Sequence, residues 1–209
     1  LGWSHGDDEL FSLEQMVQAA LWSAAERYGL EFVEITGSVP VFHPDVRVWE
    51  VRDRPGRAHR GLFYFDTFAR PGKRSGAWAS TYRVQRRMDG GVTAISSNNN
   101  NFLKGAPGAP VLLSLDDVRT LFHEFGHSLH ALLQDIAYPG LAETPRDFVE
   151  LPSQINEQWV YTRELLDRFA RHHATGEPLP DVLLEKVRAT ESFNQGYATT
   201  EAVAAAILD

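Results

Sequence analysis

The stretch Ser114-Leu-Asp-Asp-Val-Arg-Thr-Leu-Phe-His-Glu-Phe-Gly-His-Ser-Leu-His-Ala-Leu-Leu133 has the pattern of one amphipathic helix with a defined start. Ser114 and Asp117 fit a capping box, in which each side chain binds the backbone N–H of the other residue. Apolar residues recur at three- and four-residue spacing and predict the buried face. They are Leu115, Val118, Phe122, Phe125, Leu129 and Leu132/Leu133. Histidines at positions 123, 127 and 130 lie beside that face, so the stretch predicts a core-packed helix bordered by imidazoles.

The core of this stretch, His123-Glu-Phe-Gly-His127, has the spacing of a metal site. Residues four apart on a helix share one face, so both imidazoles can bind one ion, at about 2.0–2.1 Å each for zinc. Glu124 lies next to that face, where its carboxylate can take a proton from a water whose pKa the metal lowers. This is the H-E-x-x-H arrangement, with Glu124 as the predicted general base. A chance match on a solvated helix face is the alternative.

The rest of the chain divides into a helix, a sheet and further helices. A helix is predicted from about residue 9 to residue 28, with Gly29 as its stop signal. Strands with a period of two are predicted at residues 31–35, 46–52, 61–65, 77–84 and 92–96. Because no helix separates these strands, we expect a small, mostly antiparallel sheet. With helices following from residue 114, the predicted fold class is α+β.

A second helix is predicted to begin at Thr144-Pro-Arg-Asp147, with Pro145 at its first position and a kink at Pro152. Its predicted apolar face consists of Phe148, Leu151, Ile155, Trp159 and Leu166/Phe169. A further helix is predicted at residues 181–192.

The third ligand of a catalytic zinc is sought on the helix after Pro145, because such a site has three protein ligands and an open position. A polar stripe recurs there at four- and three-residue steps, formed by Glu150, Gln154, Glu157, Tyr161 and Glu164. Glu150 is the candidate ligand because it is nearest the helix start. Glu157 could hydrogen-bond a ligand histidine, and Ser153 and Gln154 could orient the site. From periodicity alone, a solvated acidic face is an equally good reading.

Composition excludes several classes of protein. The 209 residues suffice for one domain with a substantial core. A net charge of −8 without a basic run argues against nucleic acid as a partner. The absence of cysteine excludes thiolate ligands, so a zinc ion has to be held by His, Asp or Glu. No apolar stretch is long enough to span a membrane, and the first residues lack the pattern of a signal peptide.

Four blocks of the sequence carry a resemblance to a known family. They are Tyr64-Phe-Asp…Phe68-Ala-Arg-Pro-Gly-Lys73…Gly76-Ala-Trp78, Phe122-His-Glu-Phe-Gly-His127, Arg146-Asp-Phe-Val-Glu150…Pro152-Ser-Gln154…Asn156-Glu157…Trp159 and Phe193-Asn-Gln-Gly196…Thr199-Thr-Glu201. Through them the chain resembles the thimet oligopeptidase family of zinc metallopeptidases, and within it the bacterial peptidyl-dipeptidase (dipeptidyl carboxypeptidase) branch. The resemblance covers nearly the whole chain.

The resemblance implies one Zn²⁺ ion bound by His123, His127 and Glu150, with Glu124 as the base. It also implies a larger, mainly helical, two-lobed molecule with a deep channel that admits short, unstructured peptides. By analogy with related zinc peptidases, a strand near Gly76 and Ala77 pairs with the substrate backbone.

Two departures from the family pattern concern what the chain contains. Leu141-Ala-Glu-Thr144 is about two residues shorter than the usual loop, and the family's downstream segment that binds the developing oxyanion is absent. We therefore expect residues 1–209 to be a partial catalytic domain, truncated at both ends. It would comprise a helix within 1–30, a small sheet within 31–100 and metal-binding helices within 114–209. The missing remainder of the same domain is an expected partner.

The expected activity is zinc-dependent hydrolysis of short peptides with release of C-terminal dipeptides. Arg70, Lys73 and Arg74 are candidate cations for the terminal carboxylate of the substrate. Two alternatives stay open: an oligopeptidase that cleaves internally, and a non-catalytic fragment that binds zinc and peptide. The expected compartment is the cytoplasm, with the periplasm as the alternative.

Overall fold

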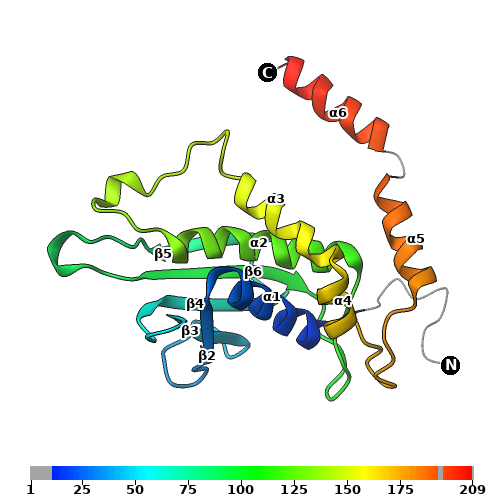
Figure 1. Ribbon diagram of the computed structural model, residues 1–209, viewed down its shortest axis with the longest axis horizontal. Helices are drawn as coiled ribbons and strands as arrows, with labels where there is room; N and C mark the ends of the chain where they lie inside the picture. The colour runs from blue at the N-terminus through cyan, green and yellow to red at the C-terminus, as the bar shows by residue number, and fades with distance from the viewer. Residues whose placement is uncertain (1–10, 193–194, 209) are drawn as a thin grey trace.

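The computed structural model describes residues 11–192 and 195–208, and its central element is a five-stranded sheet (Figure 1). In spatial order the strands are β2 (Leu30–Glu34), β3 (Val46–Asp53), β4 (His59–Phe68), β6 (Ala94–Phe102) and β5 (Trp78–Arg83). All neighbouring pairs are antiparallel except β4 and β6, which are parallel. The prediction of a small, mostly antiparallel sheet is confirmed, and β5 forms one of its two edges.

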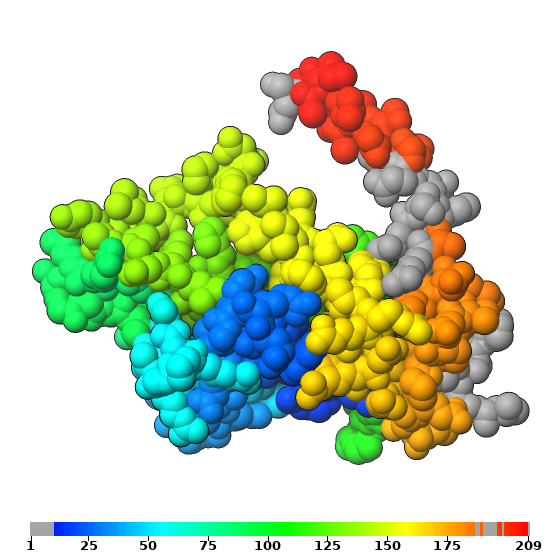
Figure 2. Space-filling model, in the orientation of Figure 1, coloured from blue at the N-terminus to red at the C-terminus, as the bar shows by residue number. Residues whose placement is uncertain are grey.

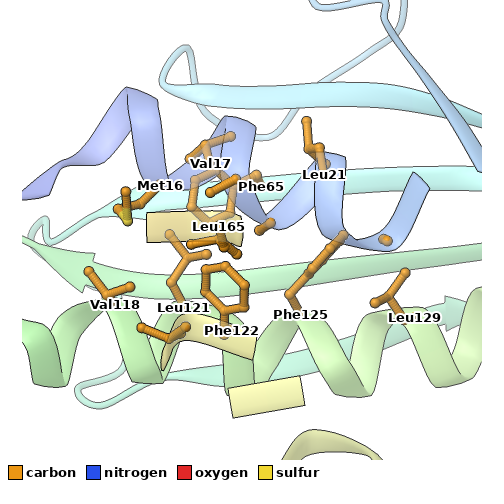
Figure 3. Close-up of a cluster of buried hydrophobic side chains, with 14 of the residues drawn as sticks. Met16, Val17, Leu21, Phe65, Val118, Leu121, Phe122, Phe125, Leu129 and Leu165 are labelled. Atoms are coloured by element: carbon orange, nitrogen blue, oxygen red, sulfur yellow. The ribbon is translucent and has the colours of Figure 1, made fainter. Parts of the chain in front are cut away.

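The hydrophobic core lies between this sheet and the helices α1 (Leu13–Tyr28), α2 (Leu115–Leu133) and α4 (Arg163–Phe169). Figure 3 shows Val17 of α1, Phe65 of β4 and Phe122 of α2 pointing into one cluster. Phe125 is 2% exposed and its ring lies 5.1 Å from that of Phe63. The side chains that the periodicity of α2 predicted all contribute to this core, and Leu121, which was not predicted, contributes as well. The α+β fold class and the capping box at Ser114 are both confirmed.

The first helix begins later than predicted. Residues 9 and 10 lie outside the described part of the chain, and α1 starts at Leu13. Before it, β1 (Phe11–Ser12) pairs with β7 (Leu112–Leu113), a small sheet that was not predicted. The N–H of Leu13 also donates to the carbonyl of Val111. These bonds hold the entry to α1 beside the entry to α2.

The prediction of a helix that begins at Pro145 is wrong. The N–H groups of Phe148 and Val149 both donate to the carbonyl of Pro145, which closes a turn, and α3 (Leu151–Glu157) begins only after Glu150. Pro152 therefore lies in the first turn of α3, where its missing N–H costs no intrahelical bond and causes no kink. The chain continues as a 3₁₀ helix, η3 (Gln158–Tyr161), and then as α4.

The predicted apolar face of this region is also partly wrong. Phe148, Leu151 and Ile155 are 49%, 45% and 47% exposed, whereas Ser153 and Asn156 are buried. The reason is that α3 turns its small and polar side toward α2. Only the later members of the predicted face, Trp159, Leu166 and Phe169, pack on the core.

The helix predicted at residues 181–192 is confirmed as α5 (Asp181–Ser192), and α6 (Gln195–Leu208) follows it, standing apart from the sheet in Figure 1. Phe193 and Asn194, part of the last block of family resemblance, lie outside the described residues. No helix in the part of the chain that the structure describes is long and apolar enough to cross a membrane.

Candidate metal centre

Helix α2 presents the two histidines of the motif side by side. The rings of His123 and His127 lie 5.0 Å apart, nearly perpendicular to each other. Between them in the sequence is Gly126, which is buried against α3. A Cβ at Gly126 would lie 2.7 Å from the Cα of Ser153 and 2.9 Å from the carbonyl oxygen of Pro152. The missing side chain therefore allows α3 to approach the histidine-bearing turn of α2.

This close approach brings Glu150 to both histidines. Its Oε2 atom lies 3.2 Å from Nε2 of His123 and 3.1 Å from Nε2 of His127. One donor atom from each of the three residues falls within 4.8 Å of the others. Two donors on a tetrahedral zinc ion, each about 2.0–2.1 Å from it, are about 3.3 Å apart. The donor set of two imidazoles and one carboxylate, and the two measured N···O separations, therefore fit zinc.

Ser153 holds the carboxylate of Glu150 in place. Its hydroxyl lies 2.8 Å from Oε2 and also 2.8 Å from the backbone carbonyl oxygen of Glu150. Burial by itself would raise the pKa of Glu150, but the bond from Ser153 and the nearby histidines outweigh burial, and the pKa lies below its usual value. Glu150 is therefore an anion at neutral pH, as a metal ligand must be.

Glu157 holds the first histidine from the side opposite to Glu150. Nδ1 of His123 lies 2.6 Å from Oε1 of Glu157, and because a carboxylate accepts, this contact favours the tautomer with the proton on Nδ1, which presents Nε2 to a metal. Arg119 binds the other oxygen of Glu157 at 3.1 Å. Of the predicted polar stripe, Glu150 and Glu157 thus face α2, while Gln154 and Glu164 point to solvent.

Two buried asparagines donate hydrogen bonds to the backbone of α2 immediately before His123. The side-chain amide of Asn98 in β6 donates to the carbonyl of Leu121 at 3.1 Å, and that of Asn156 in α3 donates to the carbonyl of Phe122 at 2.6 Å. Both asparagines are less than 5% exposed. They fix α2 between the sheet and α3, and so fix where the imidazoles point.

Sequence reasoning missed Arg119, Gly126, Asn98 and Asn156 as members of the site. A signal existed for two of them. Arg119 precedes His123 by one helical turn and so shares its face, and a glycine inside a helix costs about 1 kcal/mol, which indicates a close approach. The asparagines carried no such signal. Asn98 lies in the part of β6 (Ala94–Phe102) beyond the predicted strand end at residue 96, and Asn156 lies on the face of α3 whose burial was not predicted.

Glu124, the predicted base, lies on the same turn of α2 and is 8% exposed. Burial raises the pKa of its carboxyl group and the charge of Glu150 adds to this, while His123, a backbone hydrogen bond with Ala79 of β5 and Arg74 act in the opposite direction. A carboxylate of raised pKa beside a metal site suits a group that accepts and returns a proton. Burial also lowers the pKa of His127, which favours the neutral imidazole that a metal requires.

A cavity of about 660 Å³ opens in front of these residues, between β5, α2 and the segment of residues 134–150. His123, Glu124, His127 and Glu150 line it, together with Ala77 and Ala79 of the β5 region. Of the two predicted substrate contacts, Ala77 thus borders the cavity. Gly76 does not line it; its carbonyl accepts a hydrogen bond from Asn101.

Two of the three candidate cations for a substrate carboxylate are occupied. Arg70 binds Asp66 through two hydrogen bonds of 2.6 and 2.9 Å, and the ammonium of Lys73, 3% exposed, lies 3.1 Å from the same carboxylate. Burial alone would raise the pKa of Asp66, but these partners lower it below its usual value. Arg74 is the remaining cation, and its guanidinium stacks 4.5 Å from the ring of Trp78.

A helix that carries H-E-x-x-H, with a glutamate just before the next helix brought to the same point, is typical of zinc-dependent metallopeptidases. The family model described as Peptidase family M3 matches residues 7–209. The chain therefore belongs to peptidase family M3, the thimet oligopeptidase family, and the resemblance seen in the sequence is confirmed.

Three relatives illustrate this membership. The chain is 45% identical over 194 residues to dipeptidyl carboxypeptidase of Escherichia coli, which covers 92% of this chain and 28% of the relative. It is 39% identical over 199 residues to oligopeptidase A of the same organism, covering 91% and 29%. It is 32% identical over 226 residues to mitochondrial intermediate peptidase of Schizosaccharomyces pombe, covering 95% and 30%. The chain thus spans less than a third of the length of these relatives.

Proposed function

We propose that this chain carries the zinc-binding part of a peptidase active site, with His123, His127 and Glu150 as the metal ligands. The observation that supports this most strongly is the convergence of two Nε2 atoms on one carboxylate oxygen at 3.1–3.2 Å, with the buried Glu124 beside them. Membership of peptidase family M3 supports the same assignment.

The residues of the site divide the chemistry among them. Zinc bound there would polarise the scissile carbonyl and make water a stronger acid. The carboxylate of Glu124 accepts the proton of the attacking water and then delivers it to the leaving amine. Glu157 keeps His123 in the tautomer that presents Nε2, and Ser153 keeps Glu150 turned toward the histidines.

The substrate is proposed to be a short peptide that lies along β5. This strand is an edge of the sheet, so one row of its backbone N–H and C=O groups has no neighbouring strand. Ala77 and Ala79 border the cavity beside Glu124. An extended peptide added to this edge would place its backbone across the site by β-augmentation.

Release of C-terminal dipeptides is the proposed mode of cleavage, with internal cleavage as the second candidate. Two relatives at 45% identity are named dipeptidyl carboxypeptidase, and two relatives named oligopeptidase A are 39% identical. With Arg70 and Lys73 held by Asp66, Arg74 is the proposed cation for the terminal carboxylate. Comparing peptides with a free and an amidated C-terminus tests the two modes: dipeptide release requires the free acid.

The decisive substitution for the catalytic role is Glu124→Gln, made in the protein that carries this chain. We expect it to abolish peptide hydrolysis while the zinc content by elemental analysis stays that of the wild type. Glu164→Gln, an exposed position, is the matched control and should retain both properties. Substantial hydrolysis by the Glu124 variant would remove that residue from the proposed role. Absence of zinc-dependent hydrolysis in the wild type would favour the non-catalytic alternative.

A further inference from the structure

A second cavity, of about 550 Å³, lies next to the metal cleft and is strongly basic. His59 and Arg60 of β4, Arg83 of β5, and Arg86 and Arg87 from the turn after β5 line it. None of the described residues that line it is acidic, although the chain as a whole carries a net charge of −8. This accumulation of positive charge is therefore local and is not a consequence of overall composition.

Two of these arginines have no carboxylate partner among the described residues. Arg60 pairs with Asp53 at 2.7 Å and Arg87 with Asp135 at 3.4 Å. Arg83 instead binds neutral groups, the carbonyl and the hydroxyl of Thr93, at 2.6 and 3.0 Å. No ion pair is found for Arg86 within the part of the chain that the structure describes. Arg83 and Arg86 thus place uncompensated charge at the cavity.

The backbone around Arg86 is held in place by several hydrogen bonds. Arg86 and Val92 exchange backbone hydrogen bonds of 3.1 and 2.9 Å, and the N–H of Arg87 donates to the carbonyl of Ile136 at 3.0 Å. The side-chain oxygen of Gln85 accepts from the N–H of Ile136 at 2.8 Å. Figure 2 shows these two segments, green and yellow-green, packed together at one end of the molecule. The arginines are therefore carried by a braced segment, which reduces the entropy lost on binding.

The basic cavity borders the metal cleft, because Gln134 lines both. Gln134 follows His127 by seven residues and His123 by eleven, which at 1.5 Å per residue is a distance of about 10–16 Å along α2. An extended peptide advances about 3.3 Å per residue. A peptide that crosses the metal site along β5 therefore reaches the cavity about three to five residues from the bond to be cleaved.

We propose that this cavity is a binding subsite for a carboxylate of the peptide, with Arg83 and Arg86 as its cations. The inference rests on the proposed function, since it assumes that a peptide occupies the cleft. The carboxylate is an Asp or Glu side chain or, where cleavage is internal, the C-terminal group of the peptide. Dipeptide release places the terminal carboxylate only two residues from the cleaved bond, which is nearer than this cavity. Guanidinium groups suit it because they can donate two parallel hydrogen bonds to a carboxylate.

Binding to the Glu124→Gln variant tests this subsite without requiring hydrolysis. Fluorescent peptides of ten residues, with both ends blocked, would carry a single Glu at successive positions, and Gln-containing peptides would be the references. We expect one or two Glu positions to bind on the order of ten-fold tighter than Gln, the size of a charge-assisted hydrogen bond. Adding Arg86→Gln should remove that preference, and 0.5 M NaCl should weaken it.

Arg57→Gln is the matched control because Arg57 is 74% exposed and does not line the cavity. It should leave the preference for Glu intact. A second series of peptides contains Gln in place of Glu and has a free C-terminus. If only this series binds more tightly in a way that depends on Arg86, the carboxylate bound in the cavity is the C-terminal group. Equal binding of all acidic and neutral peptides, or a preference that survives both Arg83→Gln and Arg86→Gln, would overturn the proposal. The proposal would also be overturned if inorganic phosphate displaced the peptides while Glu- and Gln-containing peptides bound equally well.

The two proposals can fail separately. Loss of the Glu preference with zinc-dependent hydrolysis intact would reject only the subsite. A Glu preference in the binding assay, together with a wild-type protein that cleaves no peptide, would reject only the peptidase activity.

Discussion

Gly126→Ala tests whether the close approach of α3 to α2 builds the metal site. The added Cβ would lie 2.7 Å from the Cα of Ser153, where ordinary contact begins at 3.4 Å, so α3 has to move by about 0.7 Å. Overpacking of this kind costs about 1–3 kcal/mol. Alanine in place of glycine inside a helix returns about 1 kcal/mol. The expected net loss of stability is therefore modest, about 0–2 kcal/mol.

Gly126→Ala should weaken zinc binding more than it weakens the stability of the fold. Ser153 holds the carboxylate of Glu150, so a displacement of Ser153 moves a metal ligand. Removing a group that positions a ligand typically lowers metal affinity by about 10- to 100-fold. Zinc affinity measured by competition with a chromophoric chelator, beside urea denaturation of the apoprotein, separates the two effects.

Gly140→Ala is the control for this experiment, because a Cβ at Gly140 has no atom within 4 Å. It should change neither zinc affinity nor stability by much. The reasoning would be refuted if the Gly126→Ala variant were folded and bound zinc as tightly as the wild type. In that case the approach of α3 to α2 would not depend on a glycine at position 126.

Two further predictions concern the neighbours of the site. Glu157→Ala should lower zinc affinity by about 10- to 100-fold, because the Nδ1–H of His123 loses its hydrogen-bond partner. The exposed Glu164→Ala should leave the affinity unchanged. Equal zinc affinities of the two variants in a chelator competition would contradict the positioning role of Glu157. Asp66→Asn should destabilise the fold by about 3–5 kcal/mol, because it leaves a buried ammonium unpaired, while Asp89→Asn at the surface should be nearly neutral in urea denaturation. The folded-state pKa of Asp66 is lowered, so the stability that its carboxylate contributes is fully present above the unfolded-state pKa of about 3.9. This contribution is lost as the pH falls through the folded-state pKa. If the wild type were more stable than Asp66→Asn by the same amount at pH 3 as at pH 7, the link between the charge of Asp66 and stability would be disproved.

The part of the site on α2 could be predicted from sequence because it depends on local spacing. The cap at Ser114, the apolar face and the positions of His123, Glu124 and His127 all follow from the period of one helix. The five strands were also predicted, because their residues alternate and turns separate them. Their order, with β6 inserted between β4 and β5, depends on contacts across the sheet.

The region after Pro145 could not be predicted correctly, because tertiary packing overrides its local signals. Thr144 and Pro145 have the pattern of a helix start, but the carbonyl of Pro145 closes a turn instead. Burial of Asn156 and exposure of Ile155 follow from the contact with Gly126, where only a small or hydrogen-bonding surface fits. Periodicity in one segment holds no information about such a contact.

The partners of charged residues were equally hidden in the sequence. Arg70 and Lys73 were candidate substrate contacts because release of a dipeptide needs a cation for the terminal carboxylate of the substrate. In the structure both bind Asp66, whose burial requires a compensating charge. Arg119 reaches Glu157 from a different helix, a contact that the order of residues does not reveal.

Anomalous scattering at the zinc absorption edge, from crystals of the protein grown with zinc, tests the central claim most directly. The account predicts one ion, about 2.0–2.2 Å from Nε2 of His123, Nε2 of His127 and a carboxylate oxygen of Glu150. Zinc bound elsewhere, or bound by the two histidines without Glu150, would contradict it.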